Sequence, residues 1–201
     1  DYKTGSSKLS LNEIMEGLSL QLITYLLALS KTKDTKDLLP AAMMYIYLHG
    51  RPKSISVPPN GIPHAKEKEN TNGIFLNDPD VLRTLDSQSG TDDGFIGVSY
   101  VKDGSVKKTS PVLTAEQFEA LKALTEKILI RLYSRLESGE IAIHPVKNGT
   151  LSPCSYCPYR SICRFDPALP ENSFDYISKV SDKIIREKLD EEMKRNGKEN
   201  L

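Results

Sequence analysis

Three cysteines lie close together late in the chain and carry the strongest chemical signal in the sequence. Cys154, Cys157 and Cys163 follow the spacing C-x2-C-x5-C. Thiolates at this spacing can surround one centre, as zinc sites and iron-sulfur clusters require. Zinc would need a fourth ligand, for which His144 is the nearest histidine, whereas a cluster would need a fourth cysteine, and the sequence holds only three. We therefore predict a metal centre of one of these two kinds.

Aromatic and basic residues surround the cysteines in the stretch PCSYCPYRSICRFD. Exposed aromatic rings can stack on nucleobases, and arginines can pair with phosphates. The same residues could instead shield a metal centre from water. They are Tyr156, Tyr159, Arg160, Arg164 and Phe165.

An acid and a lysine stand two residues apart at the start of the chain, as Asp1 and Lys3 of DYKTG. Side chains two apart on a strand point to the same face. A carboxylate there can hold a divalent ion such as Mg2+, and an ammonium can orient or deprotonate a water and balance charge on a phosphate. The pattern D-x-K is also common by chance, so a solvated strand end is the alternative interpretation.

A glutamine and a tyrosine stand four residues apart in QLITY, as Gln21 and Tyr25. They share one face of a helix that otherwise consists mostly of Leu and Ile, and they lie in a narrow line with Gly17 and Ala28. Burying an amide and a phenol is costly unless each has a partner. We therefore expect this line to face a polar site, although a buried hydrogen-bonded pair or an interface contact would also account for it.

The elements that must position these residues alternate along the first part of the chain. Residues 1–3 resemble the end of a strand. The apolar stretch at 14–31 predicts one helix that is buried on most sides. Residues 41–50, AAMMYIYLHG, predict a buried strand.

The middle of the chain is more polar. Arg51 to Asn72 is rich in Pro, Gly, Asn, Lys and Glu, which indicates a long exposed loop. Residues 78–86 predict a short helix, and Asp103-Gly104 is typical of a hairpin turn.

A capping box at Thr114 and Gln117 predicts the start of a second long helix, which Gly139 ends. From Asp182 onward, charges alternate in a helical pattern, and we expect this last stretch to fray. The apolar stripe of the long helix comprises Phe118, Leu121, Ile128, Leu132 and Leu136.

Composition limits the class of protein. The 201 residues are 38% apolar, and 27 basic residues balance 27 acidic ones, so any DNA contact must use a local basic surface. No signal peptide and no membrane-length apolar run is recognisable, and an odd number of cysteines argues against a secreted disulfide framework. We expect a cytoplasmic protein without membrane contact.

In combination, these motifs resemble a known family. D-Y-K at a strand end, a Leu-rich helix with Q-x-x-x-Y, a strand ending in His-Gly and the cysteine trio are similar to the C-terminal nuclease domain of the AddB family, within the RecB-like PD-(D/E)XK nucleases. The resemblance covers residues 1 to about 167 and implies an α/β, restriction-endonuclease-like core with a C-terminal helical and cysteine-cluster segment. The implied division is 1–50, second half of the nuclease core; 51–113, insertion with loop and hairpin; 114–170, helix and cysteine-cluster segment; and 171–201, charged C-terminal tail.

The resemblance also implies roles for the candidate residues. Asp1 would be the second metal-binding acid, for Mg2+, and Lys3 the motif lysine. Gln21 and Tyr25 would touch DNA or position the catalytic site. Three ligands of a 4Fe-4S cluster would be Cys154, Cys157 and Cys163.

The family pattern places a first catalytic aspartate and a fourth cluster cysteine before the D-Y-K strand. We therefore expect an N-terminally truncated core, a C-terminal fragment that is inactive alone. The whole protein would be an ATP-binding helicase and Mg2+-dependent exonuclease of double-strand break repair and recombination, paired with the subunit AddA. Its cluster would staple the C-terminal segment to the start of the domain.

Three alternatives remain. The chain could be another RecB-like exonuclease with an iron-sulfur site, such as the CRISPR-associated type. It could be a nucleic-acid-binding module in which D-Y-K does nothing. It could also be an interaction domain with zinc bound by the cysteines and His144.

Overall fold

The computed structural model describes residues 9–46, 71–91, 94–170 and 172–199. The expected strand end at residues 1–3, the His-Gly pair and nearly all of the expected loop lie outside these residues. The helices are α1 (Leu11–Met15), α2 (Gln21–Ser30), α3 (Pro79–Leu85), α4 (Ala115–Glu137), α5 (Arg160–Cys163) and α6 (Asp182–Glu199), with a 3-10 turn η1 (Pro153–Ser155). The strands are β1 (Ala42–Tyr45), β2 (Asn72–Leu76), β3 (Val112–Leu113), β4 (Val146–Lys147) and β5 (Asp175–Tyr176).

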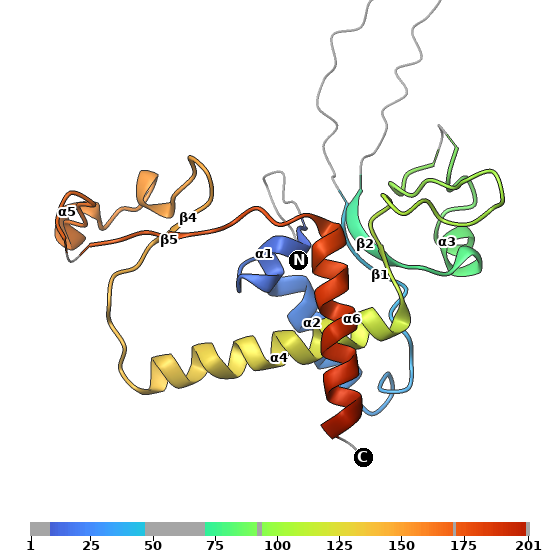
Figure 1. The fold of residues 1–201 in the computed structure, drawn as a ribbon, viewed down its shortest axis with the longest axis horizontal. Helices are drawn as coiled ribbons and strands as arrows, with labels where there is room; N and C mark the ends of the chain where they lie inside the picture. Colours follow the sequence, from blue (N-terminus) through green and yellow to red (C-terminus); the bar gives the residue numbers. More distant parts are fainter. Residues whose placement is uncertain (1–8, 47–70, 92–93, 171, 200–201) are drawn as a thin grey trace, which may run out of the picture.

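A three-stranded sheet separates two layers of the molecule (Figure 1). The central strand β2 pairs antiparallel with β1, where Met43 lies opposite Ile74, and parallel with β3, where Phe75 lies opposite Val112. Successive side chains of a strand alternate between faces. Ile74 and Leu76 therefore join the core under helices α1, α2, α4 and α6, whereas Phe75 joins a smaller core beneath α3.

The strand β2 was not predicted from the sequence. It begins at Asn72, where the expected loop ends, so the expected insertion 51–113 supplies two strands of the sheet that contains β1. A side chain at Gly73 would place its Cβ 2.6 Å from the Cβ of Met44, so the close approach of β1 and β2 requires glycine. The α3 helix is confirmed, and so is a strand after Pro40. The expected burial of this strand is not, because Met43 is the only buried residue among the four of β1.

The hairpin turn at Asp103-Gly104 is also confirmed. The amide of Val101 donates to the carbonyl of Ser105 at 2.9 Å, and Tyr100 forms a single antiparallel bridge with Val106. Gly104 has φ +85, a conformation that glycine adopts without strain.

The expected single helix at 14–31 is wrong. The backbone turns at Gly17 and Ser19, which have φ values of +81 and +50, and these interrupt the helix between α1 and α2. Glycine adopts a positive φ without strain, so the first of these turns costs little free energy. The apolar periodicity alone could not reveal this interruption.

The helix α2 is buried on one side only, not on most sides. Ile23 and Leu27 are buried, whereas Tyr25 is 48% and Leu29 is 53% exposed. Its surface therefore includes the polar line that the sequence placed on it.

The C-terminal helix α6 is part of the main core and is not a fraying tail. Ile185 and Leu189, four residues apart, are each 1% exposed and pack with residues of α1, α2 and α4. The guanidinium of Arg186 donates to the carbonyls of Lys108 at 2.7 Å and Ser110 at 2.8 Å, just before β3. Thus α6 packs against the helical layer and, through Arg186, is hydrogen-bonded to the segment that leads into β3.

The long helix α4 begins with the predicted capping box, in which Thr114 and Gln117 exchange hydrogen bonds. Phe118, Leu121 and Ile128 of its stripe are buried. Leu132 is 40% and Leu136 is 77% exposed, because the second half of α4 extends beyond the helices that cover the first half (Figure 1).

Residues 140–178 form an extension, here called the arm, that leaves the end of α4 and returns to α6 (Figure 1). It carries β4, η1, α5 and β5, and between the described residues few hydrogen bonds join it to the body. Asn148 donates to the Glu13 carboxylate at 3.3 Å, and Asn12 donates to the Ser178 carbonyl at 3.0 Å. No helix in the described ranges is long and apolar enough to span a membrane.

Candidate functional site

The predicted site residues fall into three groups in the structure. Asp1 and Lys3 lie outside the described residues. Gln21 and Tyr25 lie on α2, and the cysteine trio lies on the arm (Figure 1).

Gln21 and Tyr25 form a hydrogen-bonded pair at the surface of α2. The side-chain amide of Gln21 donates to the phenol oxygen of Tyr25 at 2.7 Å. Gln21 is half-buried, and Ala28 on the same line is exposed. The pair is therefore not a buried structural contact, and the hydrogen bond fixes the direction of the phenol at an accessible position.

The arm presents Cys154 on η1, Cys163 at the end of α5 and Cys157 between these two elements. Ser152 caps η1 by accepting from the amide of Cys154 at 3.3 Å, and Cys163 ends α5. Cys154 and Cys157 are half-buried, Cys163 is exposed, and all three are free thiols. Thiolates are the donors that zinc and iron-sulfur centres use, so the donor type fits such a centre.

The observed positions of the donors do not complete a metal site. Within the described ranges, no three His, Cys, Asp or Glu side chains are grouped closely enough to hold an ion. The Nδ1 of His144, the candidate fourth ligand for zinc, lies 3.4 Å from the Ser173 hydroxyl. A cluster on the arm would therefore require the cysteines to draw together around it.

A row of aromatic rings, here called the aromatic ladder, runs along the arm beside the cysteines. It comprises Phe165, Phe174 and Tyr176, with ring centroids 4.8 Å apart for the first pair and 6.1 Å for the second, both edge to face. The Nζ of Lys147 lies 4.9 Å from the Phe174 ring and 5.7 Å from the Tyr176 ring. Sequence reasoning missed all but Phe165, although the F-x-Y spacing of 174–176 places two rings on one strand face.

The base of the arm is fixed to the end of α4 by an ion pair. The guanidinium of Arg135 donates from Nε to Glu140 at 2.7 Å. This hydrogen bond lowers the pKa of Glu140 and raises that of Arg135. The carboxylate of Glu140 is thus engaged at the base and does not reach the cations farther along the arm.

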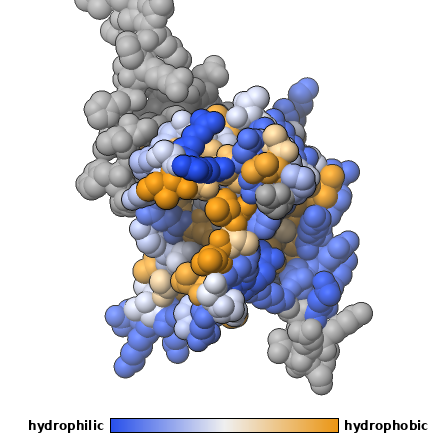
Figure 2. Space-filling view, turned by 90° about the vertical axis from the view of Figure 1, so that its left-hand side faces the viewer, coloured by the Kyte–Doolittle hydropathy of each residue, from blue (hydrophilic) through white to orange (hydrophobic). Residues whose placement is uncertain are grey.

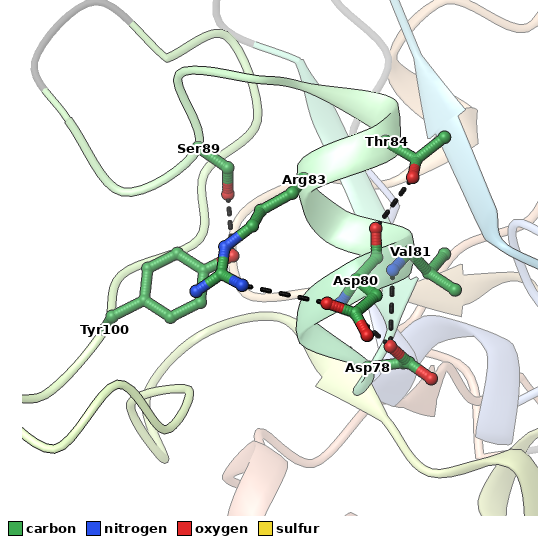
Figure 3. Close-up of polar contacts among 7 residues, drawn as sticks. All are labelled: Asp78, Asp80, Val81, Arg83, Thr84, Ser89 and Tyr100. Atoms are coloured by element: carbon green, nitrogen blue, oxygen red, sulfur yellow. Dashed lines mark hydrogen bonds and ion pairs between the residues drawn. The ribbon is translucent and has the colours of Figure 1, made fainter.

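Two carboxylates at the start of α3 have structural partners (Figure 3). Asp78 caps the helix by accepting from the amides of Asp80 at 2.9 Å and Val81 at 3.2 Å. Asp80 lies 3.7 Å from the guanidinium of Arg83. Since Asp78 serves as a cap and Asp80 is almost fully exposed, we assign this pair to helix stability.

Two comparisons place the chain among nucleases. A family model for the PD-(D/E)XK nuclease superfamily matches residues 1–164, which confirms the predicted α/β, restriction-endonuclease-like fold class. Proteins named as a subunit of ATP-dependent helicase/deoxyribonuclease are similar. The one from Desulforamulus reducens is 33% identical over 92% of the chain, that from Clostridium kluyveri 34% over 96%, and that from Bacillus licheniformis 31% over 98%. The matched region is 16%, 17% and 18% of those proteins, so the chain spans about a sixth of their length.

Proposed function

The chain belongs to the PD-(D/E)XK nuclease superfamily, and we propose that it is the nuclease portion of an AddB-type subunit that cleaves DNA exonucleolytically. The observation that carries this proposal is the continuous family match over residues 1–164. The match includes the D-Y-K motif, the Gln21–Tyr25 pair and all three cysteines.

We assign Asp1 to Mg2+ binding. Lys3 would orient the water or balance the charge that develops on the phosphate. Among the described residues, no three His, Cys, Asp or Glu side chains form a metal site that lacks Asp1. When bound, Mg2+ polarises the scissile phosphate and acidifies a water. Tyr25, with its phenol oriented by Gln21, would contact the DNA strand as it enters the site.

We propose that Cys154, Cys157 and Cys163 hold a 4Fe-4S cluster together with a fourth cysteine from outside this chain. The free thiols and their spacing support this assignment. The cluster would supply a structural cross-link that the sparse contacts between arm and body do not provide.

The proposal extends to the biology of the whole protein. The similar proteins are named as helicase/deoxyribonuclease subunits, which supports DNA as substrate, an ATP-dependent helicase activity and a partner subunit of the AddA kind. We place this activity in double-strand break repair and recombination. Free thiols suit the reducing cytoplasm.

The nuclease assignment is tested with Lys3→Ala. Mg2+-dependent degradation of linear double-stranded DNA should fall at least 100-fold in a polypeptide long enough to complete the site, because removing one transition-state donor costs about that much. Lys33→Ala, an exposed lysine after α2, is the control and should cleave normally. Degradation by Lys3→Ala at the wild-type rate would rule out the assignment. We expect the 201-residue chain alone to be inactive.

The metal assignment is tested by elemental analysis of protein purified without oxygen. Iron and acid-labile sulfide in nearly equal amounts are expected. Zinc without sulfide would instead favour an interaction domain, and the cluster proposal would then be abandoned.

A further inference from the structure

Two rings of the aromatic ladder lie on one face of the short ribbon formed by β4 and β5. Lys147 and Tyr176 are register partners on these parallel strands. Phe174 stands two residues before Tyr176 and so shares its face, whereas Asp175 points to the other. The ribbon therefore gathers two rings and one cation on the same face, and the cation–ring distances confirm this arrangement.

The ladder is open at one end. Phe165 and Phe174 are half-buried and support each other edge to face, whereas Tyr176 is 69% exposed. Two more tyrosines of the arm, Tyr156 and Tyr159, are 82% and 67% exposed. Figure 2 views the molecule from the side that faces left in Figure 1, the side of the arm, and shows hydrophobic side chains scattered between hydrophilic ones. An aromatic ring that packs against the protein on one side and is exposed to solvent on the other can stack on a further ring.

The arm also carries three cations that make no ion pair with the described carboxylates. In the described part of the chain, ion pairs engage none of its three cations, Lys147, Arg160 and Arg164, with a carboxylate. The carboxylate of Asp166 accepts from the amide of Ala168 at 2.9 Å. The acids of the arm, Glu140, Asp166, Glu171 and Asp175, outnumber its cations, so contact with phosphates would use these three cations individually and not a net positive charge.

From these observations we propose that the ladder face of the arm is a binding site for single-stranded DNA. One base stacks on Tyr176, and Lys147, Arg160 and Arg164 contact the flanking phosphates. In a duplex, neighbouring bases cover each other's faces, so a stacking platform selects the single strand. The proposal rests on the proposed function in taking DNA as the polymer, and it assigns to the arm a role that does not require its residues to touch the cleaved bond.

The test measures binding of a fluorescent oligo(dT) of about 15 nucleotides, roughly one single-strand site, by anisotropy without Mg2+. The protein is a polypeptide long enough to include the fourth cysteine, purified with its metal. Tyr176→Ala should weaken binding about 5- to 100-fold, the effect of losing one base–aromatic stack. Tyr176→Phe should bind within about twofold of wild type, because the ring and not the hydroxyl stacks. Tyr133→Ala, a 63% exposed tyrosine on α4, is the matched control and should not change binding.

Charge is tested separately with Arg160→Gln against Arg131→Gln, an exposed arginine on α4. Arg160→Gln should weaken binding and make the slope of log affinity against log salt shallower by about 0.7, the value for one phosphate contact with a single strand. Arg131→Gln should leave that slope unchanged.

Several results would overturn the proposal. These are equal affinities of Tyr176→Ala and Tyr133→Ala, an equal loss of affinity for duplex DNA, or tighter binding of oligo(rU) than of oligo(dT). Since binding is measured without Mg2+, the outcome does not depend on Lys3. A protein that binds as expected but never cleaves DNA would overturn the proposed function alone, and one that cleaves DNA while Tyr176→Ala binds normally would overturn only this inference.

Discussion

Gln21 donates to the phenol of Tyr25 across one turn of α2, at a position that solvent reaches. A hydrogen bond of this kind contributes little to folding, because both groups could bond to water instead. Its effect is to restrict where the phenol points. The effect of this hydrogen bond on the stability of the fold and its effect on the direction of the phenol can be measured separately.

We expect Tyr25→Phe to change the free energy of unfolding by less than about 1 kcal/mol. DNA cleavage by a polypeptide that completes the site should nevertheless fall at least tenfold, because the phenol would no longer be available to the DNA. Urea denaturation and a nuclease assay measure the two effects. Tyr133→Phe on α4 is the control, and unchanged cleavage by Tyr25→Phe would remove the residue from the site.

At the scale of elements, α6 has the most consequential packing. Its sequence is strongly charged, yet Ile185 and Leu189 fill the main core beneath it, and Gln117 of α4 donates to Asp190 at 2.8 Å. Two buried apolar residues one turn apart are enough to fix the helix when the facing helices supply the rest of the core.

Neighbouring isoleucines of α6 give a direct test. Ile185→Ala should lower the free energy of unfolding by about 2–5 kcal/mol, because it removes buried methyl groups and leaves a cavity. Ile184→Ala, where the side chain is 46% exposed, should change it by less than about 1 kcal/mol. Urea denaturation of both variants is the measurement. Equal effects would mean that α6 does not pack as described.

An ion pair between α4 and α6 predicts a pH dependence. The ammonium of Lys127 hydrogen-bonds to the carboxylate of Glu192 and lowers the pKa of Glu192 below its ordinary 4.5. A lowered folded-state pKa stabilises the protein above that ordinary value, and this stabilisation is lost as the pH falls through the folded-state pKa.

We therefore expect Glu192→Gln to be less stable than wild type at neutral pH, by up to about 1 kcal/mol. The difference should shrink as the pH falls from neutral through the lowered folded-state pKa of Glu192, because the carboxylate is then protonated. Urea unfolding at neutral and at acid pH measures it. Glu187→Gln, on an exposed part of α6 and 3.8 Å from Lys183, is the control, with an effect of no more than about 0.5 kcal/mol. A difference that persists in acid would point to packing and not to charge.

At the scale of the whole molecule, the body and the arm are stabilised in different ways. The body has two apolar cores on either side of its sheet. The described arm has short elements, exposed apolar side chains and a few polar contacts to α1. A metal centre on its three thiols is the addition that would make it rigid.

Cys157→Ser should therefore remove the iron and the visible absorbance of a cluster and weaken DNA binding. Trypsin should then cut the arm faster at Lys147, Arg160 and Arg164, while the body keeps its thermal unfolding midpoint within a few degrees. Elemental analysis, absorbance, oligonucleotide anisotropy and limited proteolysis measure these effects. Ser155→Ala, between the cysteines, is the control. Unchanged proteolysis and DNA binding after loss of the metal would show that the centre does not support the arm.

The sequence by itself determined the local features. Capping residues fixed the start of α4, Asp103-Gly104 fixed a turn, and the apolar run after Pro40 fixed β1, because each depends on residues a few positions apart. The motifs also sufficed to recognise the family. The roles of Asp1 and Lys3 remain predictions, since these residues lie outside the described ranges.

Only the tertiary structure decided which apolar side chains are covered. It placed the short stretch NGIFL at the centre of the sheet, gave α6 a core role despite its charge, and left the second half of the α4 stripe exposed. It also brought Lys147 beneath the rings of Phe174 and Tyr176, some 30 residues away in sequence. Burial and such contacts depend on partners distant in the chain, and local periodicity carries no information about those partners.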